Sequence, residues 1–262
     1  MTRDADYLSI ILEPIRICRA YRPKFGHGAG HNLEEFQALY RSDPFYAWFG
    51  LDSPLMYTAH RVAGGMTSIY RQIGIGCQRL VQQILMDQLR LTAQESTWSY
   101  QVKPRGGKSR TLALDARIEL AAILNAKRRA KAARWLRAAS RELAIDPALT
   151  RVLRGGVFEV RQGYKSKDSK RQQADLSNAS AAYAATYVPV LMLLSSQIDE
   201  DVAERYQNAR WLILRGTTTG LATNSTYVFC RDVLEYDLAA FFERNSTQLK
   251  NETENVLKAL LK

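Results

Sequence analysis

Residues 157–165 read Val-Phe-Glu-Val-Arg-Gln-Gly-Tyr-Lys, a β-branched and aromatic run that contains one acid, Glu159. Such a run predicts a strand. The run Val-Pro-Val-Leu-Met-Leu-Leu at 188–194 predicts another strand, which is apolar enough to be covered on both faces. The Ala-rich residues 172–187 between them predict a helix. A buried sheet is therefore expected at the centre of the fold.

Elements on either side of this region extend the sheet. Residues 97–102 and 110–118 predict a hairpin around the turn 104–109, and 211–214 predict a short strand. Apolar residues at helical spacing predict one long helix over 66–91. The fold class expected is α/β of the α+β kind, with a central mixed sheet of about four to five strands flanked by helices.

The remaining segments are predicted to be helical. Helices are expected over 7–20, where Pro14 breaks the pattern, and over 32–41, where Asn32 and Glu35 form a capping box. Others are expected over 199–208, 236–244 and 253–261. We expect a single domain over residues 1–262, with an N-terminal extension (1–65), a core (66–195) that contains a basic helical insertion (119–154), and a C-terminal helical part (196–262).

Composition and charge narrow the class of protein. The 262 residues include 37 Lys and Arg against 26 Asp and Glu, a net charge of +11. This excess favours a polyanionic partner, most simply nucleic acid, although charge also serves solubility. The three cysteines, Cys18, Cys77 and Cys230, lie far apart, which excludes a disulfide scaffold and a cysteine-based zinc site. Without an evident secretory signal or membrane span, we expect a cytoplasmic protein.

The strongest concentration of charge lies in a predicted helix over 119–143. Its cations are Lys127, Arg128, Arg129, Lys131, Arg134, Arg137 and Arg141. Such a density predicts contact with the phosphates of duplex DNA, and the alternative is a solvated helix face. Asp146 follows this helix and precedes Pro147, so we interpret it as a helix cap rather than a metal ligand.

Two acids lie within predicted apolar strands. Alternation places Asp115 on the same face as Ala113 and Arg117, and Glu159 lies between Phe158 and Val160. An acid in such a place is costly unless it meets a cation. Two acids on adjacent strands can share Mg²⁺, which uses one or two carboxylates and keeps several waters. The alternative is that Asp115 and Glu159 pair with Arg117 and Arg161. Gln78 and Gln82, one helical turn apart, are candidates to face the same site.

The order of elements, with an acid in the second strand and Glu-x-(basic) in the third, resembles the PD-(D/E)XK nuclease superfamily. Residues 158–172 look like the catalytic strand and following loop of type II restriction endonucleases, and residues 236–245 are similar to the ApaLI-like group. The resemblance covers roughly residues 66–245. It implies Mg²⁺-dependent cleavage of both strands of a short palindromic site in duplex DNA by a homodimer. It also implies a cognate DNA methyltransferase that acts on the same site without an obligatory complex.

The resemblance also assigns roles to individual residues. Asp115 and Glu159 would be the metal ligands, and the basic catalytic residue would be Arg161 or Lys165. The superfamily pattern has Lys two residues after the Glu, where this chain has Arg161, which stays protonated and cannot take a proton from water. Lys165 lies about 20 Å from Glu159 along a straight strand. The loop cations predicted to line the DNA channel are Lys165, Lys167, Lys170 and Arg171.

Two other functions fit the same pattern. One is a non-catalytic nucleic-acid-binding protein, in which Arg161 marks a lost active site. The other is a toxin-type nuclease on the same fold that is directed by structure or acts on RNA. Only the restriction enzyme requires a fixed cut site in duplex DNA.

Overall fold

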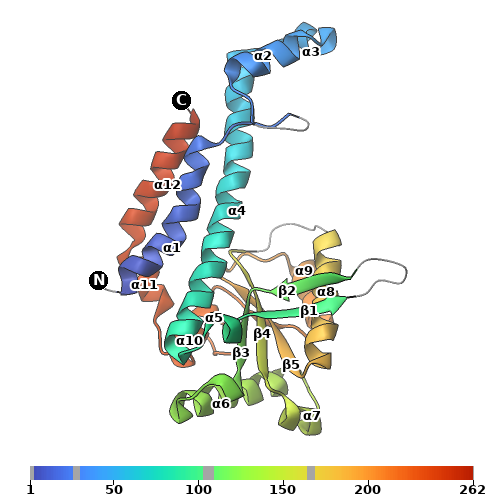
Figure 1. Ribbon diagram of the computed structural model, residues 1–262, viewed down its shortest axis with the longest axis vertical. Helices are drawn as coiled ribbons and strands as arrows, with labels where there is room; N and C mark the ends of the chain where they lie inside the picture. Colours follow the sequence, from blue (N-terminus) through green and yellow to red (C-terminus); the bar gives the residue numbers. More distant parts are fainter. Residues whose placement is uncertain (1–2, 26–29, 103–108, 164–168, 262) are drawn as a thin grey trace. The chain divides into compact units, whose positions relative to one another are not determined.

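The computed structural model describes residues 3–25, 30–102, 109–163 and 169–261 (Figure 1). The chain divides into two compact units. The first unit comprises residues 1–76 and 244–262, and the second comprises residues 77–243. The boundary falls within one continuous helix, α4 (Pro54–Leu89), between Gly76 and Cys77. These units divide the chain differently from the predicted extension, core and C-terminal part.

The first unit is helical. In it, α1 (Arg3–Ile17) contacts α12 (Ser246–Leu261). The predicted break at Pro14 is wrong, because Pro14 lies buried inside α1, which continues into a short 3₁₀ turn, η1 (Cys18–Ala20). A Cβ atom on Gly76 would lie 3.2 Å from the Cα of Ile11, so this glycine allows α4 and α1 to approach closely.

Two shorter helices of the first unit precede α4. The capping box predicted at the start of α2 (Leu33–Arg41) is confirmed, since Asn32 Oδ1 accepts from the Glu35 N–H at 2.8 Å. Glu35 Oε2 accepts from the Asn32 N–H, also at 2.8 Å. The next helix, α3 (Pro44–Trp48), begins at Asp43, whose side chain accepts from the Phe45 N–H.

The second unit contains the predicted mixed sheet flanked by helices. Four strands lie in the order β3 (Ala116–Glu119), β4 (Gly155–Arg161), β5 (Tyr187–Leu193) and β6 (Leu212–Leu214). Strand β3 is antiparallel to β4, whereas β4, β5 and β6 are parallel. The hairpin of β1 (Trp98–Val102) and β2 (Arg110–Leu114) forms a separate two-stranded sheet.

Both faces of the four-stranded sheet are covered. One face packs with the hairpin, α8 (Ser169–Ala184) and α9 (Glu200–Asn208) in a common hydrophobic core. On the other face, Phe158 of β4 stacks with Trp135 of α6 (Ala126–Glu142) and Phe229 of α10 (Thr226–Asp232). The remaining helices are α5 (Ala93–Ser96), η2 (Leu120–Ala122), α7 (Pro147–Val152) and α11 (Leu238–Arg244).

Several boundaries differ from the predictions. The helix α4 begins at Pro54 rather than at residue 66, α12 begins at Ser246 rather than at residue 253, and β4 ends at Arg161 rather than at residue 165. Three other differences concern the sheet and α6. The strand predicted over 110–118 bends at Asp115 and becomes β2 and β3. Strand β4 begins with Gly155 and Gly156. Residue 155 must be glycine, because a side chain there would collide with the Ile118 carbonyl of the neighbouring strand. The basic helix begins at Ala126 rather than at Glu119, since Glu119 ends β3 and Asn125 caps α6.

The three cysteines are free and buried. Burial raises the pKa of Cys77 and of Cys230 to about 12. In the described part of the chain, no helix combines the length and the apolar composition that crossing a bilayer requires.

Candidate active site

Strand pairing brings Asp115 and Glu159 to the same place. Ala116 is paired with Phe158 in the β3–β4 ladder, so Asp115 and Glu159 are the next residues along the two strands. Residues opposite each other in an antiparallel ladder lie on the same face of the sheet. The register therefore places both residues at one end of this ladder. Glu159 lies on the face covered by α8 and α9, whereas Asp115 lies at the bend that precedes β3.

The carboxylate of Asp115 is held by the backbone and by a helix. Its Oδ2 accepts from the Val160 N–H at 2.8 Å and from Gln78 Nε2 at 3.2 Å. Gln78, on α4, also donates to the Val160 carbonyl at 3.3 Å. Gln82 lies elsewhere and donates to Ser96 Oγ. Of the two candidate glutamines, Gln78 is thus the one that contacts the site.

Glu159 belongs to a buried ionic network. Arg161 Nη2 lies 2.8 Å from Glu159 Oε1 and 2.8 Å from Asp175 Oδ2. Asp175 comes from α8, and its Oδ2 also accepts a hydrogen bond from the Tyr206 hydroxyl of α9. The exposed fraction is at most 8% for all four residues. Asp175 and Tyr206 had no distinguishing signal in the sequence, because each lies in an ordinary polar or amphipathic helix.

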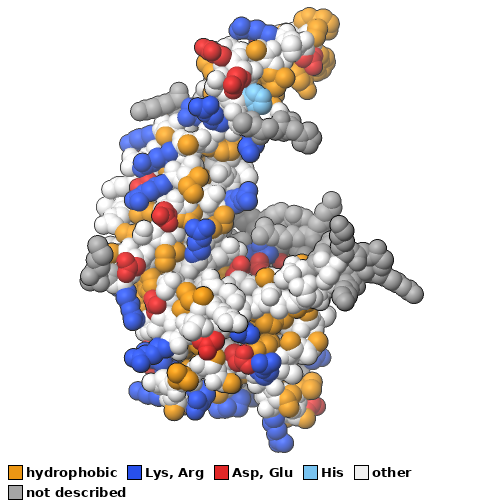
Figure 2. Space-filling view, in the orientation of Figure 1, with side chains coloured by type: hydrophobic (Ala, Val, Ile, Leu, Met, Phe, Trp, Pro, Cys, Tyr) orange, Lys and Arg blue, Asp and Glu red, His pale blue; other side chains and the backbone are white. Residues whose placement is uncertain are grey.

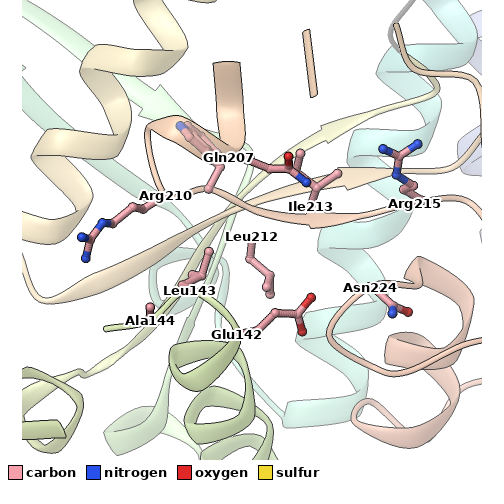
Figure 3. A pocket seen from close by; sticks show the side chains of 10 residues that line it. Glu142, Leu143, Ala144, Gln207, Arg210, Leu212, Ile213, Arg215 and Asn224 are labelled. Carbon is pink, nitrogen blue, oxygen red and sulfur yellow. The ribbon is translucent and has the colours of Figure 1, made fainter. Parts of the chain in front are cut away.

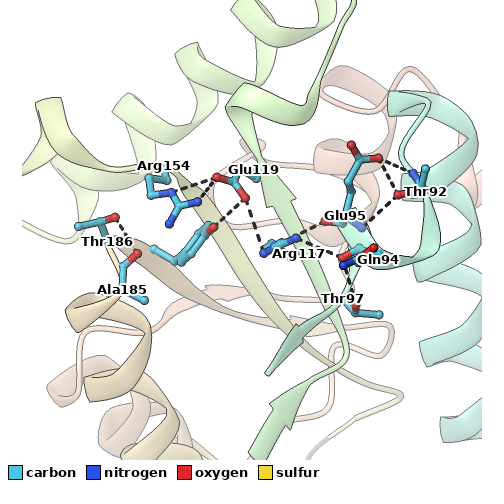
Figure 4. Close-up of polar contacts among 10 residues, drawn as sticks. Thr92, Gln94, Glu95, Thr97, Arg117, Glu119, Arg154, Ala185 and Thr186 are labelled. Atoms are coloured by element: carbon cyan, nitrogen blue, oxygen red, sulfur yellow. Dashed lines mark hydrogen bonds and ion pairs between the residues drawn. The ribbon is translucent and has the colours of Figure 1, made fainter. Parts of the chain in front are cut away.

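The alternative expected Glu159 to pair with Arg161 and Asp115 to pair with Arg117, and the structure contains the first of these two pairs. Arg117 instead donates to the Glu95 carbonyl and lies 3.6 Å from Glu119 Oε2. Glu119 also accepts from Arg154 and from the Tyr187 hydroxyl (Figure 4).

The Glu119 cluster is separate from the site of Asp115. The two acids are four residues apart along the chain, which is about 13 Å in an extended strand. Burial alone would raise the pKa of Glu119, but hydrogen bonds from Arg154 and Tyr187 and the charges of Arg154 and Arg117 lower it below the usual value. The pKa of Tyr187 is raised by its burial and by this bond to Glu119. This cluster joins the starts of β4 and β5 to the end of β3 and serves the fold.

The residues present suit one kind of metal. Within the described ranges, no group of three or more His, Cys, Asp or Glu side chains could hold an ion. Mg²⁺ needs only one or two carboxylates and keeps several waters, so Asp115 and Glu159 are a sufficient donor set for it.

The basic residues of the predicted site fall into two groups. Arg161 lies beside Glu159, as expected from its place in the strand. Lys165 and Lys167 lie outside the described residues. Lys170 and Arg171 lie in the first turn of α8. A role in catalysis or DNA binding for Lys165, Lys167, Lys170 and Arg171 stays a prediction.

The basic helix α6 presents its charges unevenly. Ala132, Trp135, Leu136, Ala139 and Ser140 form its buried face. Arg128 and Lys131 flank that face and reach Glu235, with Lys131 Nζ 2.7 Å from Glu235 Oε1. Helical spacing places Lys127, Arg134, Arg137 and Arg141 on the opposite side, and all four are exposed. This second set is named the basic stripe.

Asp146 is confirmed as a helix cap. Its Oδ1 accepts from the Ala148 N–H at 2.6 Å, and Pro147 takes the first position of α7. It therefore remains distinct from Asp115 and Glu159.

A pocket of about 360 Å³ lies beside β6, at the far edge of the sheet from β3 (Figure 3). Its lining includes Glu142, Arg210, Arg215 and Asn224. Arg215 is held there by both carboxylate oxygens of Glu200, at 2.8 and 2.9 Å. The pocket contains none of the predicted catalytic or DNA-binding residues.

Comparisons with known proteins add no family assignment: no family model matches the chain, and no curated protein or solved structure matches it either.

Proposed function

We propose that this chain is a type II restriction endonuclease, which hydrolyses phosphodiester bonds of duplex DNA at a short palindromic site with Mg²⁺. The observation that carries the proposal is the meeting of Asp115 and Glu159 at one end of the β3–β4 ladder, with Arg161 bonded to Glu159. Paired carboxylates beside a permanent cation suit phosphoryl chemistry, because they bind a hard metal ion and balance phosphate charge. Cutting both strands of a palindrome requires two symmetric sites, hence a homodimer.

Each residue of the site then has a defined task. Asp115 and Glu159 would hold Mg²⁺, which when bound lowers the pKa of a water and stabilises charge on the phosphate. Gln78 and the Val160 N–H orient the Asp115 carboxylate. Arg161 keeps its proton and so stabilises negative charge on the phosphate instead of acting as a base.

One observation favours a second candidate. Arg161 Nη2 is shared by two carboxylates inside a nearly closed network, and such networks can serve the fold alone. In that case the chain would be a non-catalytic protein that binds DNA through α6. A toxin-type nuclease has no separate observation in its favour.

A plasmid digestion separates these functions. The purified chain is incubated with supercoiled plasmid in Mg²⁺ or in EDTA, and the ends of the products are sequenced. The proposal expects discrete fragments that share one end sequence in Mg²⁺ and no cleavage in EDTA. Binding without cleavage in Mg²⁺ would support the second candidate, and ends without a common sequence would support a toxin-type nuclease.

Substitution of the two acids tests the site itself. Asp115→Ala and Glu159→Ala should each lower cleavage by more than about 100-fold, since changing groups that only orient metal ligands already costs about 10- to 100-fold. DNA binding should persist, because a repulsive carboxylate is removed. Asp146→Ala is the matched control, an acid in the same unit that only caps a helix. Undiminished cleavage by Glu159→Ala would refute the assignment.

A further inference from the structure

A group of large apolar side chains lies exposed on α2, on α3, just after α3 and in the first turn of α4. Figure 2 shows hydrophobic side chains gathered over this part of the chain. We name this group the aromatic surface; its exposed fractions run from 40% to 80%, and its members are Leu39, Phe45, Tyr46, Trp48, Phe49 and Leu55.

The exposed area of this surface lies at the upper end of the range found on single chains. An aromatic side chain presents about 150–250 Å² when fully accessible, so the four rings of this surface together expose about 500 Å². The largest apolar patch on a typical monomer is about 300–600 Å² and is often functional. With Leu39 and Leu55 added, the surface approaches the roughly 800 Å² that each partner contributes to a standard interface.

The aromatic surface is mounted on a second, inner layer of rings. Phe36 is fully buried and packs against Phe25, Tyr40 and His60, with ring centroids 4.3 to 5.8 Å apart. Tyr40 stacks in turn on Tyr46 of the outer layer. Phe45 contacts both Tyr46 and Phe49. Because these three rings are held before any partner arrives, binding costs little ordering of their side chains.

The charge around this surface excludes the polyanionic partners that the rest of the chain favours. Residues 39–55 contain one cation, Arg41, and two acids, Asp43 and Asp52. Arg41 Nε lies 2.9 Å from Asp52 Oδ2, so the cation is already paired. The segment therefore attracts neither DNA nor an anionic membrane, and its low charge does not oppose contact with a copy of itself.

From the area, the rigid support and the low charge, we propose that a second copy of this chain covers the aromatic surface. The contact is a two-fold one, in which the same side chains of both copies meet, so that it closes on a dimer. Trp48, the most exposed ring, lies at its centre. The assignment stands whether or not the chain cleaves DNA.

Tryptophan fluorescence tests the contact in the unaltered protein. The chain has four tryptophans, and Trp98, Trp135 and Trp211 are buried whereas Trp48 is 79% exposed. Acrylamide quenching is measured over a dilution series of the full-length chain, beside sedimentation velocity. Quenching should be weak at concentrations where the dimer sediments and should rise on dilution to monomer. Strong, concentration-independent quenching would overturn the proposal.

Paired variants place the contact at this surface. Trp48→Ser with Phe49→Ser should raise the dissociation constant of the dimer at least tenfold, as expected for a central aromatic anchor. Leu124→Ser, which removes an equally exposed side chain from the second unit, should leave the dimer intact. A double variant that stays dimeric would refute the proposal. So would protection of Trp48 by lipid vesicles or duplex DNA without any dependence on protein concentration.

Discussion

At Arg161, a single guanidinium nitrogen serves two carboxylates, one from its own strand and one from α8. A lysine ammonium could meet both acids as a point charge, but it could also lose its proton in a buried site, whereas the guanidinium does not. Asp175 therefore keeps a permanent cation attached to the helix side of the site even when Glu159 is engaged by a metal. This makes Asp175 a positioning residue for Arg161 within the proposed mechanism.

Asp175→Asn should destabilise the protein more than Tyr206→Phe. Breaking a buried ion pair costs about 3–5 kcal/mol, and here we expect about 2–3 kcal/mol because Glu159 still pairs with Arg161. Removal of the Tyr206 hydroxyl should cost about 1 kcal/mol, the usual worth of one hydrogen bond. Urea unfolding measures both values. Equal costs would mean that the Asp175–Arg161 pair adds nothing beyond its hydrogen bonds.

Glu119 should make stability depend on acid pH. Its pKa is lowered in the folded state, so its contribution is complete above the unfolded value of about 4.3 and is lost as the pH falls through the folded value. In Glu119→Gln, the free energy of unfolding should therefore fall less between pH 5 and pH 3 than in the unaltered chain. Urea unfolding at several pH values measures this slope.

The control for Glu119 is Glu254→Gln. Glu254 also has a lowered pKa, because of its hydrogen bond with Lys258 one turn along α12, but it lies exposed on the helix surface. Exposed pairs of this kind contribute little. An acid slope that changes as much in Glu254→Gln as in Glu119→Gln would contradict the role given to the Glu119 cluster.

Among the elements, α6 has the positive charge that its sequence predicts, but tertiary packing divides its cations into a paired group and an exposed group. Glu235, more than 90 residues further along the chain, engages Arg128 and Lys131 on the inner flank of the helix. The basic stripe on the opposite side spans residues 127–141, about 21 Å along the helix axis. Our proposal therefore assigns phosphate contact to this stripe rather than to the helix as a whole.

Removing the stripe should change the salt dependence of DNA binding. Each phosphate that the protein no longer neutralises flattens the slope of log affinity against log salt by about 0.9, so Arg134→Ala, Arg137→Ala and Arg141→Ala together should flatten it by about 2.7. Affinity should fall equally for all DNA sequences, because interactions with the DNA backbone carry no sequence information. Fluorescence anisotropy at several salt concentrations measures the slope.

The matched control for the stripe is the pair Arg128→Ala and Lys131→Ala. These two cations are held by Glu235, so their removal should flatten the slope clearly less than removal of the stripe. A slope that stays at the unaltered value in the triple variant would show that α6 does not contact DNA. The cations at positions 165–171 of the sequence would then become the leading candidates.

For the whole molecule, the sequence predicted what depends on local pattern. Alternation and apolar runs located β4 and β5, with Glu159 inside β4 and Asp115 next to the start of β3. The bend at Asp115 was missed because it is fixed by the Val160 N–H, a partner 45 residues away. Asp175, Tyr206 and Glu235 were missed for the same reason, since only tertiary packing brings them to Arg161 and α6.

The division into two compact units was also beyond the sequence. It falls inside α4, whose helical pattern continues through Gly76 and Cys77 with no loop, proline or change of composition to mark a boundary. Helix periodicity reports the local path of the chain. Which other segments pack on each half of a helix is decided by partners from both ends of the sequence.

The alkylation rates of the buried cysteines can show whether the two units open separately. Cys18 lies in the first unit and Cys230 in the second, and both thiols are buried. A buried thiol reacts with an alkylating reagent only when its surroundings open. Alkylation followed by peptide mass spectrometry should therefore give a separate opening free energy for each unit. Different rates at Cys18 and Cys230 would show that the units open independently, and equal rates would show that the chain opens in one global event.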